Sequence, residues 1–355
     1  MESAARPPRR PREPGEGITE AAVRWGFRML AGREPLNEAE FAAFQALPDM
    51  PGLRRTLANT HEFHAFFGAL LTPHQAWTMP LFLLRPPSNA AIEWRFTPPS
   101  LDAPVCQMAT IAQFAEPAFQ EIIAAMGLRP GRQRAVWEQA WIIATLATAG
   151  AIAPGKRAFG LETGRERIAS VLAARGTAVT AFANGLADPQ AIERRRLQLF
   201  HPEACPIEEF DARVACGPLD PREVGSLPAG HFDAAWSIGL PDQLGSIAAA
   251  MEVFEASLVP LRPGGIAAHV FSLNLASNGL TWEEPANVLV RRQDIEALAE
   301  RLRAKGHTLL PLNTHPGQDL ADEQVHSELG GPAGHRQRRG MMVHAAFGLA
   351  IRKGG

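Results

Sequence analysis

The sequence has few cysteines and no long apolar run, and both absences exclude classes of protein. Its three cysteines, Cys106, Cys205 and Cys216, lie far apart in a chain of 355 residues. An odd number without paired metal-ligand spacing predicts neither a disulfide framework nor a zinc site. We therefore expect a protein of the reducing cytoplasm. No apolar run reaches the roughly 20 residues that cross a bilayer, so we predict no membrane span.

An excess of one charge is also missing. Lys and Arg number 35 against 37 Asp and Glu, which gives a formal net charge of -2, and the basic residues are spread along the chain. A surface for nucleic acid or membrane needs a concentrated basic patch, so neither is an expected partner. The eleven histidines are irregularly spaced, and we expect no metal site. A hydrophobic content of 46% suits a chain that buries a core.

The N-terminal part is predicted to hold a tail and a small helical module. Residues 1–17, "MESAARPPRRPREPGEG", contain prolines and arginines but no apolar segment after the basic residues, so they predict a disordered tail and not a secretory signal. In residues 18–71, Val23, Phe27 and Leu30 recur at helical spacing, and a turn at "GREP" separates further helical patterns. This range is predicted to be all-helical.

The remainder is predicted to be a connector and one α/β domain. Residues 72–104 carry repeated prolines without a sustained period, which predicts a connector that crosses a surface and forms no core. In residues 105–355, strand-like pieces such as "TAVTAFA" and "GIAAHVFSL" alternate with helical ones such as "GSIAAAMEVFEASLVPL". This alternation predicts a doubly wound, mainly parallel sheet covered by helices, with ligands at the carboxyl ends of its strands.

One glycine turn in this domain is a candidate ligand loop. In "RAFGLETGRE", Gly160 and Gly164 come after a strand-like run, and a helical pattern comes next. The free N–H groups at the start of a helix after such a turn can bind polar or anionic groups. The pattern alone is not specific, because tight structural connections share it. Glu162 stands where another small residue would be usual.

The order of several motifs adds a resemblance to a family. The glycine loop, the strand "FDAAWS", a helix, the turn "LRPGG" and a further strand resemble class I S-adenosylmethionine-dependent methyltransferases, and "MMVHAAFGLAIRKGG" suits the closing antiparallel strand of their seven-stranded, Rossmann-like sheet. The segments "TIAQF", "VWEQAWI" and "AAWSIGLPDQLGSI" narrow it to a bacterial subgroup often encoded near glycan-assembly genes. The segments "RMLAGREP" and "LRRTLANTHEF" resemble the phycobilisome-linker-like helical module.

The methyltransferase resemblance implies S-adenosylmethionine as methyl donor and a set of site residues. The implied cofactor-binding residues are Gly160, Glu162, Gly164, Asn184, Asp220, Ser237 and Ile238. Within this set, Asp220 would contact the adenine amino group. The implied catalytic residues on the acceptor side are Asp242 and Gln243, which precede "LGS".

Three positions depart from the family pattern. Glu162 replaces the middle glycine of the loop, Ala183 replaces the acid that binds the ribose, and Gln243 replaces a histidine. Loss of a charge-assisted ribose contact costs on the order of 1.5–3 kcal/mol. Methyl transfer itself needs little acid–base help, because the sulfonium donor is already activated.

The sequence supports three functional hypotheses. The first is S-adenosylmethionine-dependent methyl transfer onto a small molecule, a glycan or a cell-envelope precursor. The second is a catalytically degenerate member that acts as a binding or assembly partner, with the N-terminal helices contacting another protein. The third is a Rossmann-type dehydrogenase, which Ala183 disfavours because a nicotinamide ribose also requires an acid.

Overall fold

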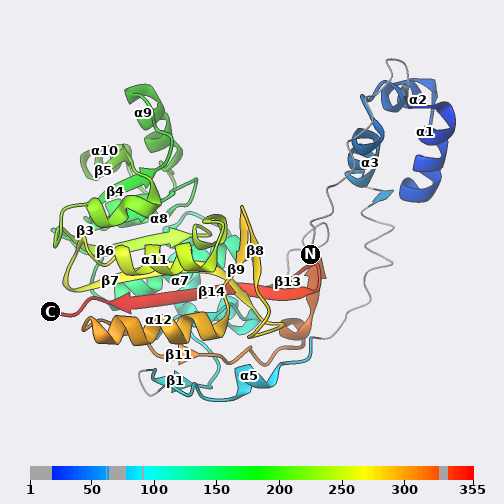
Figure 1. The fold of residues 1–355 in the computed structure, drawn as a ribbon. Helices are drawn as coiled ribbons and strands as arrows, with labels where there is room; N and C mark the ends of the chain where they lie inside the picture. Colours follow the sequence, from blue (N-terminus) through cyan, green and yellow to red (C-terminus); the bar gives the residue numbers. More distant parts are fainter. Residues whose placement is uncertain (1–17, 61, 64–76, 90–91, 328–334) are drawn as a thin grey trace, which may run out of the picture. The chain divides into compact units, whose positions relative to one another are not determined.

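The computed structural model describes residues 18–60, 62–63, 77–89, 92–327 and 335–355 (Figure 1). The described residues fall into two compact units, one within the first 73 residues and the other from residue 77 on. The predicted tail and part of the predicted connector lie outside the described residues.

The first unit is helical. It comprises α1 (Glu20–Gly26), a π-helical turn η1 (Phe27–Ala31), α2 (Glu38–Gln45) and α3 (Met50–Ala58). The side chains that cap the three α-helices, each accepting a hydrogen bond from a first-turn N–H, are Thr19, Asn37 and Asp49. Phe27 and Leu57 are fully buried in the small core between the helices.

A groove of about 270 Å³ lies between α1–η1 and α3 in this unit. Trp25, Met29 and Met50 line it and are 60%, 67% and 51% exposed. Large apolar side chains exposed together around a concave surface are typical of contact sites. Arg54 lines the same groove and places a positive charge there.

The second unit is built on one sheet that has ten strands among the described residues, three more than predicted. The sheet has the order β12-β13-β14-β7-β6-β3-β4-β5, and β2 and β10 also pair with β14. The strands are β2 (Gln107–Met108), β3 (Arg157–Leu161), β4 (Ala178–Ala183), β5 (Val214–Pro218), β6 (Phe232–Ile238), β7 (Leu261–Asn274), β10 (Thr308–Leu309), β12 (Val325–Ser327), β13 (Arg336–Arg339) and β14 (Met342–Arg352).

The central strands β5, β4, β3, β6 and β7 are parallel, and β14 runs antiparallel to β7. The strand-like segments quoted from the sequence form β4, β6, β7 and β14, as predicted. The chain order of the strands reverses between β3 and β6. Such a reversal places a crevice at the carboxyl ends of these two strands.

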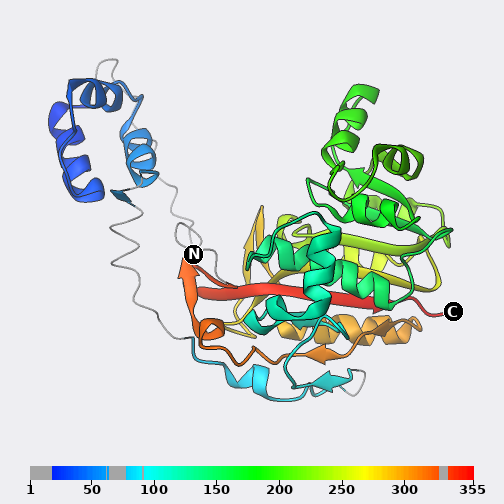
Figure 2. The same cartoon turned by 180° about the vertical axis from the view of Figure 1, so that it is seen from behind.

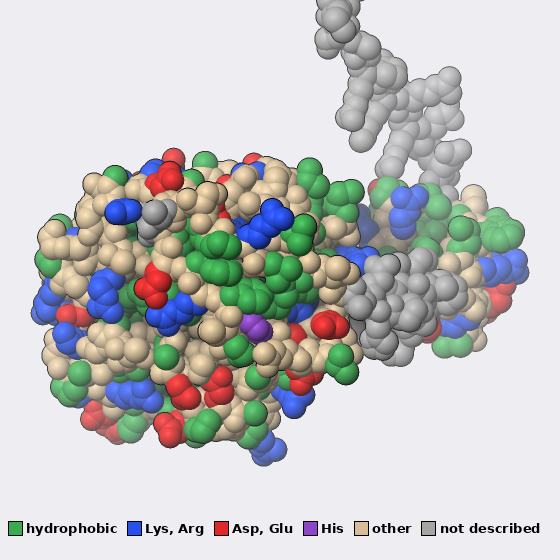
Figure 3. All heavy atoms as spheres, turned by 90° about the horizontal axis from the view of Figure 1, so that it is seen from below, with side chains coloured by type: hydrophobic (Ala, Val, Ile, Leu, Met, Phe, Trp, Pro, Cys, Tyr) green, Lys and Arg blue, Asp and Glu red, His purple; other side chains and the backbone are tan. Residues whose placement is uncertain are grey.

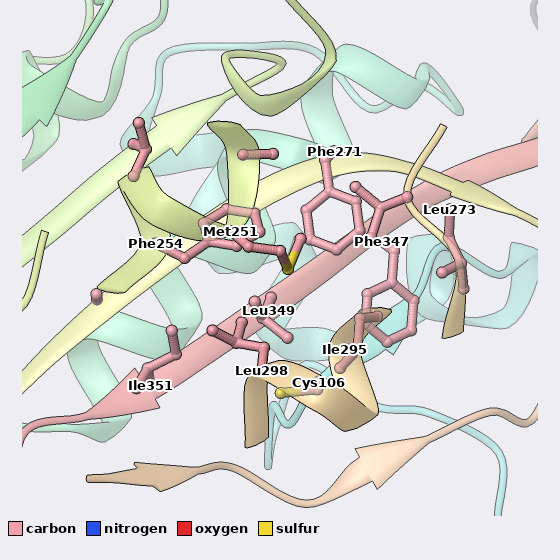
Figure 4. Close-up of a cluster of buried hydrophobic side chains, with 14 of the residues drawn as sticks. Cys106, Met251, Phe254, Phe271, Leu273, Ile295, Leu298, Phe347, Leu349 and Ile351 are labelled. Atoms are coloured by element: carbon pink, nitrogen blue, oxygen red, sulfur yellow. The ribbon is translucent and has the colours of Figure 1, made fainter. Parts of the chain in front are cut away.

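Helices cover both faces of the sheet. They are α6 (Pro117–Ala125), α7 (Arg134–Thr148), α8 (Ile168–Ala174), α9 (Pro189–Gln198), α10 (Ile207–Arg213), α11 (Ile247–Ala256) and α12 (Arg292–Ala304). On one face, side chains of α11 and α12 meet Phe271 of β7 and Phe347 of β14 (Figure 4). On the other face, seen in Figure 2, α7 crosses the sheet with Trp137 and Trp141 fully buried.

Residue size alternates along β14 to suit these two faces. Phe347 belongs to the core beneath α11 and α12, whereas its neighbour Ala346 belongs to the core beneath α7. Gly348 lies directly against the Trp141 indole, where a Cβ atom would overlap the ring. Only a residue without a side chain lets β14 approach the tryptophan so closely.

The predicted connector differs from expectation in its described part. It contains α5 (Leu81–Leu84) and β1 (Trp94–Arg95), and β1 pairs in parallel with β11 (Leu312–Asn313). Leu83 is fully buried in the core beneath α12, so the expectation of a segment without a core was wrong here. The prolines interrupt the periodicity but leave apolar residues free to pack. Figure 3 views this side of the molecule and shows hydrophobic side chains gathered near the middle of the face.

We predict that Gly348→Ala lowers the free energy of unfolding by about 1–3 kcal/mol, because the new methyl group overpacks the Trp141 contact. Urea unfolding monitored by tryptophan fluorescence measures the change. Gly279→Ala is the matched control, since a Cβ there has no atom within 4 Å. Equal effects of the two substitutions would contradict the packing argument.

Candidate functional site

The loop after β3 brings two of the predicted site residues together. Glu162 has a φ of 48°, and it is the one residue other than glycine with positive φ in the described ranges. Its Oε1 accepts a hydrogen bond of 2.7 Å from the backbone N–H of Asn184, which comes directly after β4. A left-handed backbone costs a non-glycine residue roughly 1–2 kcal/mol. The hydrogen bond to Asn184 offsets part of that cost and fixes a carboxylate across the ends of two parallel strands.

The two glycines of this loop have different surroundings. A Cβ at Gly160 would lie 2.5 Å from atoms of Trp236 and Thr163, so packing alone requires glycine there. Gly164 has more space, because its nearest neighbour to a Cβ would be a Glu166 oxygen at 3.5 Å. The space beside Gly160 is therefore filled by Trp236 and Thr163, whereas a Cβ at Gly164 would meet only an ordinary van der Waals contact.

Glu166 closes this loop and was not among the predicted site residues. Its Oε2 accepts a hydrogen bond of 2.6 Å from Gly164 N–H. Burial raises the pKa of this carboxyl, and the nearby Trp236 indole and Arg195 guanidinium partly counteract the rise. Arg195 also donates to the carbonyl of Thr163 at 2.8 Å. The signal available in the sequence was an acid two residues after the second glycine.

The other predicted cofactor residues, Asp220 after β5 and Ser237 and Ile238 on β6, do not contact the loop after β3 through any side-chain hydrogen bond in the described structure. Asp220 is the N-cap of the 3-10 turn η3 (Pro221–Ser226), and its Oδ1 accepts from Arg222 N–H at 2.9 Å. Ser237 Oγ lies 2.8 Å from His269 Nδ1 in the buried interior, so its hydroxyl is engaged away from the strand ends. Ile238 is the last residue of β6.

The histidine beside Ser237 has an interior role. His269 Nε2 lies 3.1 Å from the hydroxyl of Ser257, and burial lowers the pKa of His269 to about 3. A neutral imidazole with both ring nitrogens paired to hydroxyls satisfies the core polar groups. His269 is therefore no base for catalysis.

A cluster of hydrogen-bonded polar side chains surrounds Asp242, which lies in the 3-10 turn η4 (Pro241–Gln243) after β6. The Asp242 carboxylate accepts from Ser272 twice, from N–H at 2.9 Å and from Oγ at 2.7 Å. Arg134, at the start of α7, donates to Ser272 Oγ at 3.1 Å and to Glu138 at 2.7 Å. Its remaining nitrogen donates to Gln337 of β13 at 2.9 Å.

Burial raises the pKa of Asp242 to about 6, while the hydrogen bonds from Ser272 and the charge of Arg134 limit the rise. A carboxyl group that titrates near neutral pH can accept a proton at physiological pH. The cluster joins one predicted residue, Asp242, with Arg134, Ser272 and Gln337, which sequence reasoning missed. They come from three elements that only the folded sheet brings together.

Gln243 does not join this cluster. It is exposed, and in the described structure its side-chain amide has no hydrogen-bond partner. Among the described residues, no three His, Cys, Asp or Glu side chains gather to hold a metal ion, and no helix is long and apolar enough to cross a membrane.

Comparisons with known proteins give structural matches alone. No protein-family model and no curated protein matches the chain. Geranyl diphosphate methyltransferase, solved with S-adenosylmethionine, is 14% identical, with a TM-score of 0.39 over 65% of this chain and 94% of its own. An arsenic(III) S-adenosylmethionine methyltransferase from Chlamydomonas reinhardtii is 13% identical, with a TM-score of 0.36 over 58% and 65%. The [4+2]-cyclase SpnF is 18% identical, with a TM-score of 0.39 over 71% of this chain and 99% of its own. At these values the matches do not assign the chain to a family.

We predict that Asp242→Asn changes the pH dependence of stability. The pKa of Asp242 in the folded chain is about 6, above its ordinary value of 3.8, so deprotonation destabilises the folded state. Relative to the variant, the free energy of unfolding of the wild-type chain should fall by about 3 kcal/mol in all as the pH rises from below about 4 to above about 6. Chemical unfolding of both proteins across this range measures the difference. Parallel stability curves would contradict the raised pKa.

Proposed function

We propose that the protein is a cytoplasmic, bacterial S-adenosylmethionine-dependent methyltransferase, with its donor at the ends of β3 and β4 and its acceptor beside Asp242. The Asp242 cluster carries the proposal, because this carboxyl group of near-neutral pKa comes directly after β6, one of the two strands between which the strand order reverses. The antiparallel β14 beside β7 further favours this function over a dehydrogenase, whose sheet would continue with a parallel strand.

Glu162 is the proposed ribose ligand. Ala183 leaves the end of β4 without an acid, and the Glu162 carboxylate lies at that end through its bond to Asn184. A carboxylate oxygen can accept more than one hydrogen bond, so Glu162 can keep this bond and still receive a ribose hydroxyl. Asp220 would take the adenine amino group, and Gly164 allows close approach of the donor. S-adenosylmethionine, when bound, supplies an activated methyl group.

Asp242 is the proposed base for the acceptor. Its carboxylate, oriented by Ser272 and Arg134, can take the proton that an acceptor hydroxyl loses as it becomes a nucleophile. The hydroxyl of a glycan or cell-envelope precursor is the acceptor class implied by the sequence resemblance. Arg134 holds the Ser272 hydroxyl that donates to Asp242, and it does not itself exchange a proton.

A degenerate, non-catalytic chain is the second candidate, and a specific observation favours it. Trp236 fills the space beside Gly160, and Glu162 occupies the loop where a glycine would leave room for the donor. In that case the helical unit would supply the function through the groove lined by Trp25 and Met29, with a protein as partner.

Calorimetric titration with S-adenosylmethionine and S-adenosylhomocysteine separates the two candidates. We expect binding by the wild-type chain and binding weaker by about tenfold or more for both Glu162→Gln and Glu162→Gly, because each removes the ribose carboxylate. The matched control is Glu193→Gln, an exposed acid on α9. Absence of binding by the wild-type chain, with binding gained by Glu162→Gly, would show a degenerate site.

If the donor binds, release of S-adenosylhomocysteine with a panel of glycan acceptors tests catalysis. The rate should rise with pH through about 6 as Asp242 loses its proton. Asp242→Asn should retain donor binding and lose at least about a hundredfold in rate. A variant with full rate and an unchanged pH profile would rule out Asp242 as the base.

A further inference from the structure

A small cavity lies beside β13, away from the proposed donor loop. It has a volume of about 120 Å³, and its walls include Trp77, Arg336 and the acids Asp319, Asp322 and Glu323. Three strands, β14, β7 and β6, lie between β13 and β3 in the sheet. The four inter-strand spacings of ~4.8 Å put β13 about 19 Å from β3. The cavity is therefore distinct from the loop of Glu162, and ligand binding there does not depend on the proposed methyl transfer.

Arg336 is a buried cation with free donors. It is 2% exposed, and its guanidinium lies 4.3 Å from the centroid of the Trp77 ring. One nitrogen, Nη2, donates to the carbonyl of Pro316. Nε and Nη1 of Arg336, and Nε1 of Trp77, are buried without a hydrogen-bond partner in the described structure. Buried polar groups are normally satisfied, so three unpaired donors beside one cavity require an acceptor.

The ligand must present an anionic group to Arg336 but carry no net negative charge. Burial lowers the pKa of Arg336 to about 10, so it remains cationic at neutral pH. Nε–H and the Nη1 hydrogens leave the guanidinium on different sides, so a carboxylate forms a charge-assisted hydrogen bond with one of them and does not bridge both. The same walls hold three acids against one arginine, so a simple anion would meet a lining that is negative overall.

The three acids that line the cavity differ in exposure and in how far their carboxylates are already hydrogen-bonded. Both oxygens of the buried Asp322 accept backbone hydrogen bonds, from Ile111 at 2.9 Å and from Asp319 at 3.2 Å. Asp319 and Glu323 are exposed, so they lie at the rim of the cavity. The interior therefore offers donors and the rim offers carboxylates.

We propose that this cavity binds a small zwitterion of the α-amino acid class. Its carboxylate would accept from Arg336 and from Trp77 Nε1, and its ammonium would face Asp319 and Glu323. The cavity has the volume of about four water molecules at ~30 Å³ each, enough for a small amino acid whose larger substituents project outward. The half-buried Trp77 ring lies over the guanidinium and forms one wall of the cavity.

Thermal unfolding and calorimetry of the full chain test the proposal with glycine and L-alanine, compared with acetate, methylamine and phosphate. A ligand that binds only the folded state raises Tm in a saturable way. We expect this from the two amino acids and at least about tenfold weaker binding of acetate and methylamine, since each lacks one charge. Arg336→Met should abolish the amino acid effect. Arg338→Met, an exposed arginine on the same strand, should retain it.

Glu323→Gln tests the rim without touching the buried arginine. It should weaken alanine binding and strengthen acetate binding, because one negative charge is removed. Trp77→Phe keeps an aromatic ring over the guanidinium and removes the Nε1 donor, so it should weaken the binding of both ligands. Acetate or phosphate binding the wild-type chain as tightly as alanine would show a plain anion site and overturn the proposal. Absence of any saturable shift would show that water alone fills the cavity, which overturns it equally.

Discussion

The pairing of β14 with β7 is the interaction on which the second unit depends. Its register runs through nine consecutive pairs, from His344 with Asn274 to Arg352 with Ile266. The outer edge of β14 pairs in turn with β13, β2 and β10, so one strand joins segments from both ends of the domain to the parallel sheet. Its two faces are distinguished by residue size, with phenylalanine and leucine toward α12 and glycine and alanine toward the tryptophans of α7.

The same strand positions the polar chemistry. Because β13 is held by β14, Gln337 reaches Arg134 at the start of α7, and Arg134 in turn reaches Ser272 on β7. Asp242 receives both hydrogen bonds from Ser272 in this way. The carboxyl group is stabilised by donors but remains desolvated, and the balance leaves its pKa near neutrality. A fully solvated aspartate would be a much weaker base.

Two residues of the predicted site are held against their local preference. Glu162 adopts a backbone conformation that favours glycine, and Asp242 is charged where burial opposes charge. Residues held at such cost against local preference cluster at functional sites. Both groups lie on segments that come after neighbouring strands of the sheet, β3 and β6, which are paired in parallel.

The sequence by itself determined the helical N-terminal unit, the alternation of strands and helices, and the strands β4, β6, β7 and β14, because these depend on local periodicity. It also singled out Glu162 as a departure from the family pattern and Asp242 as a candidate catalytic residue. Tertiary structure decided the ten-strand count, the burial of Leu83, and the engagement of Ser237 with His269 in the interior. It likewise decided the partners of Asp242 and the cavity of Arg336. These features join residues that lie far apart in the chain, and their energies come from desolvation and packing that no local pattern encodes.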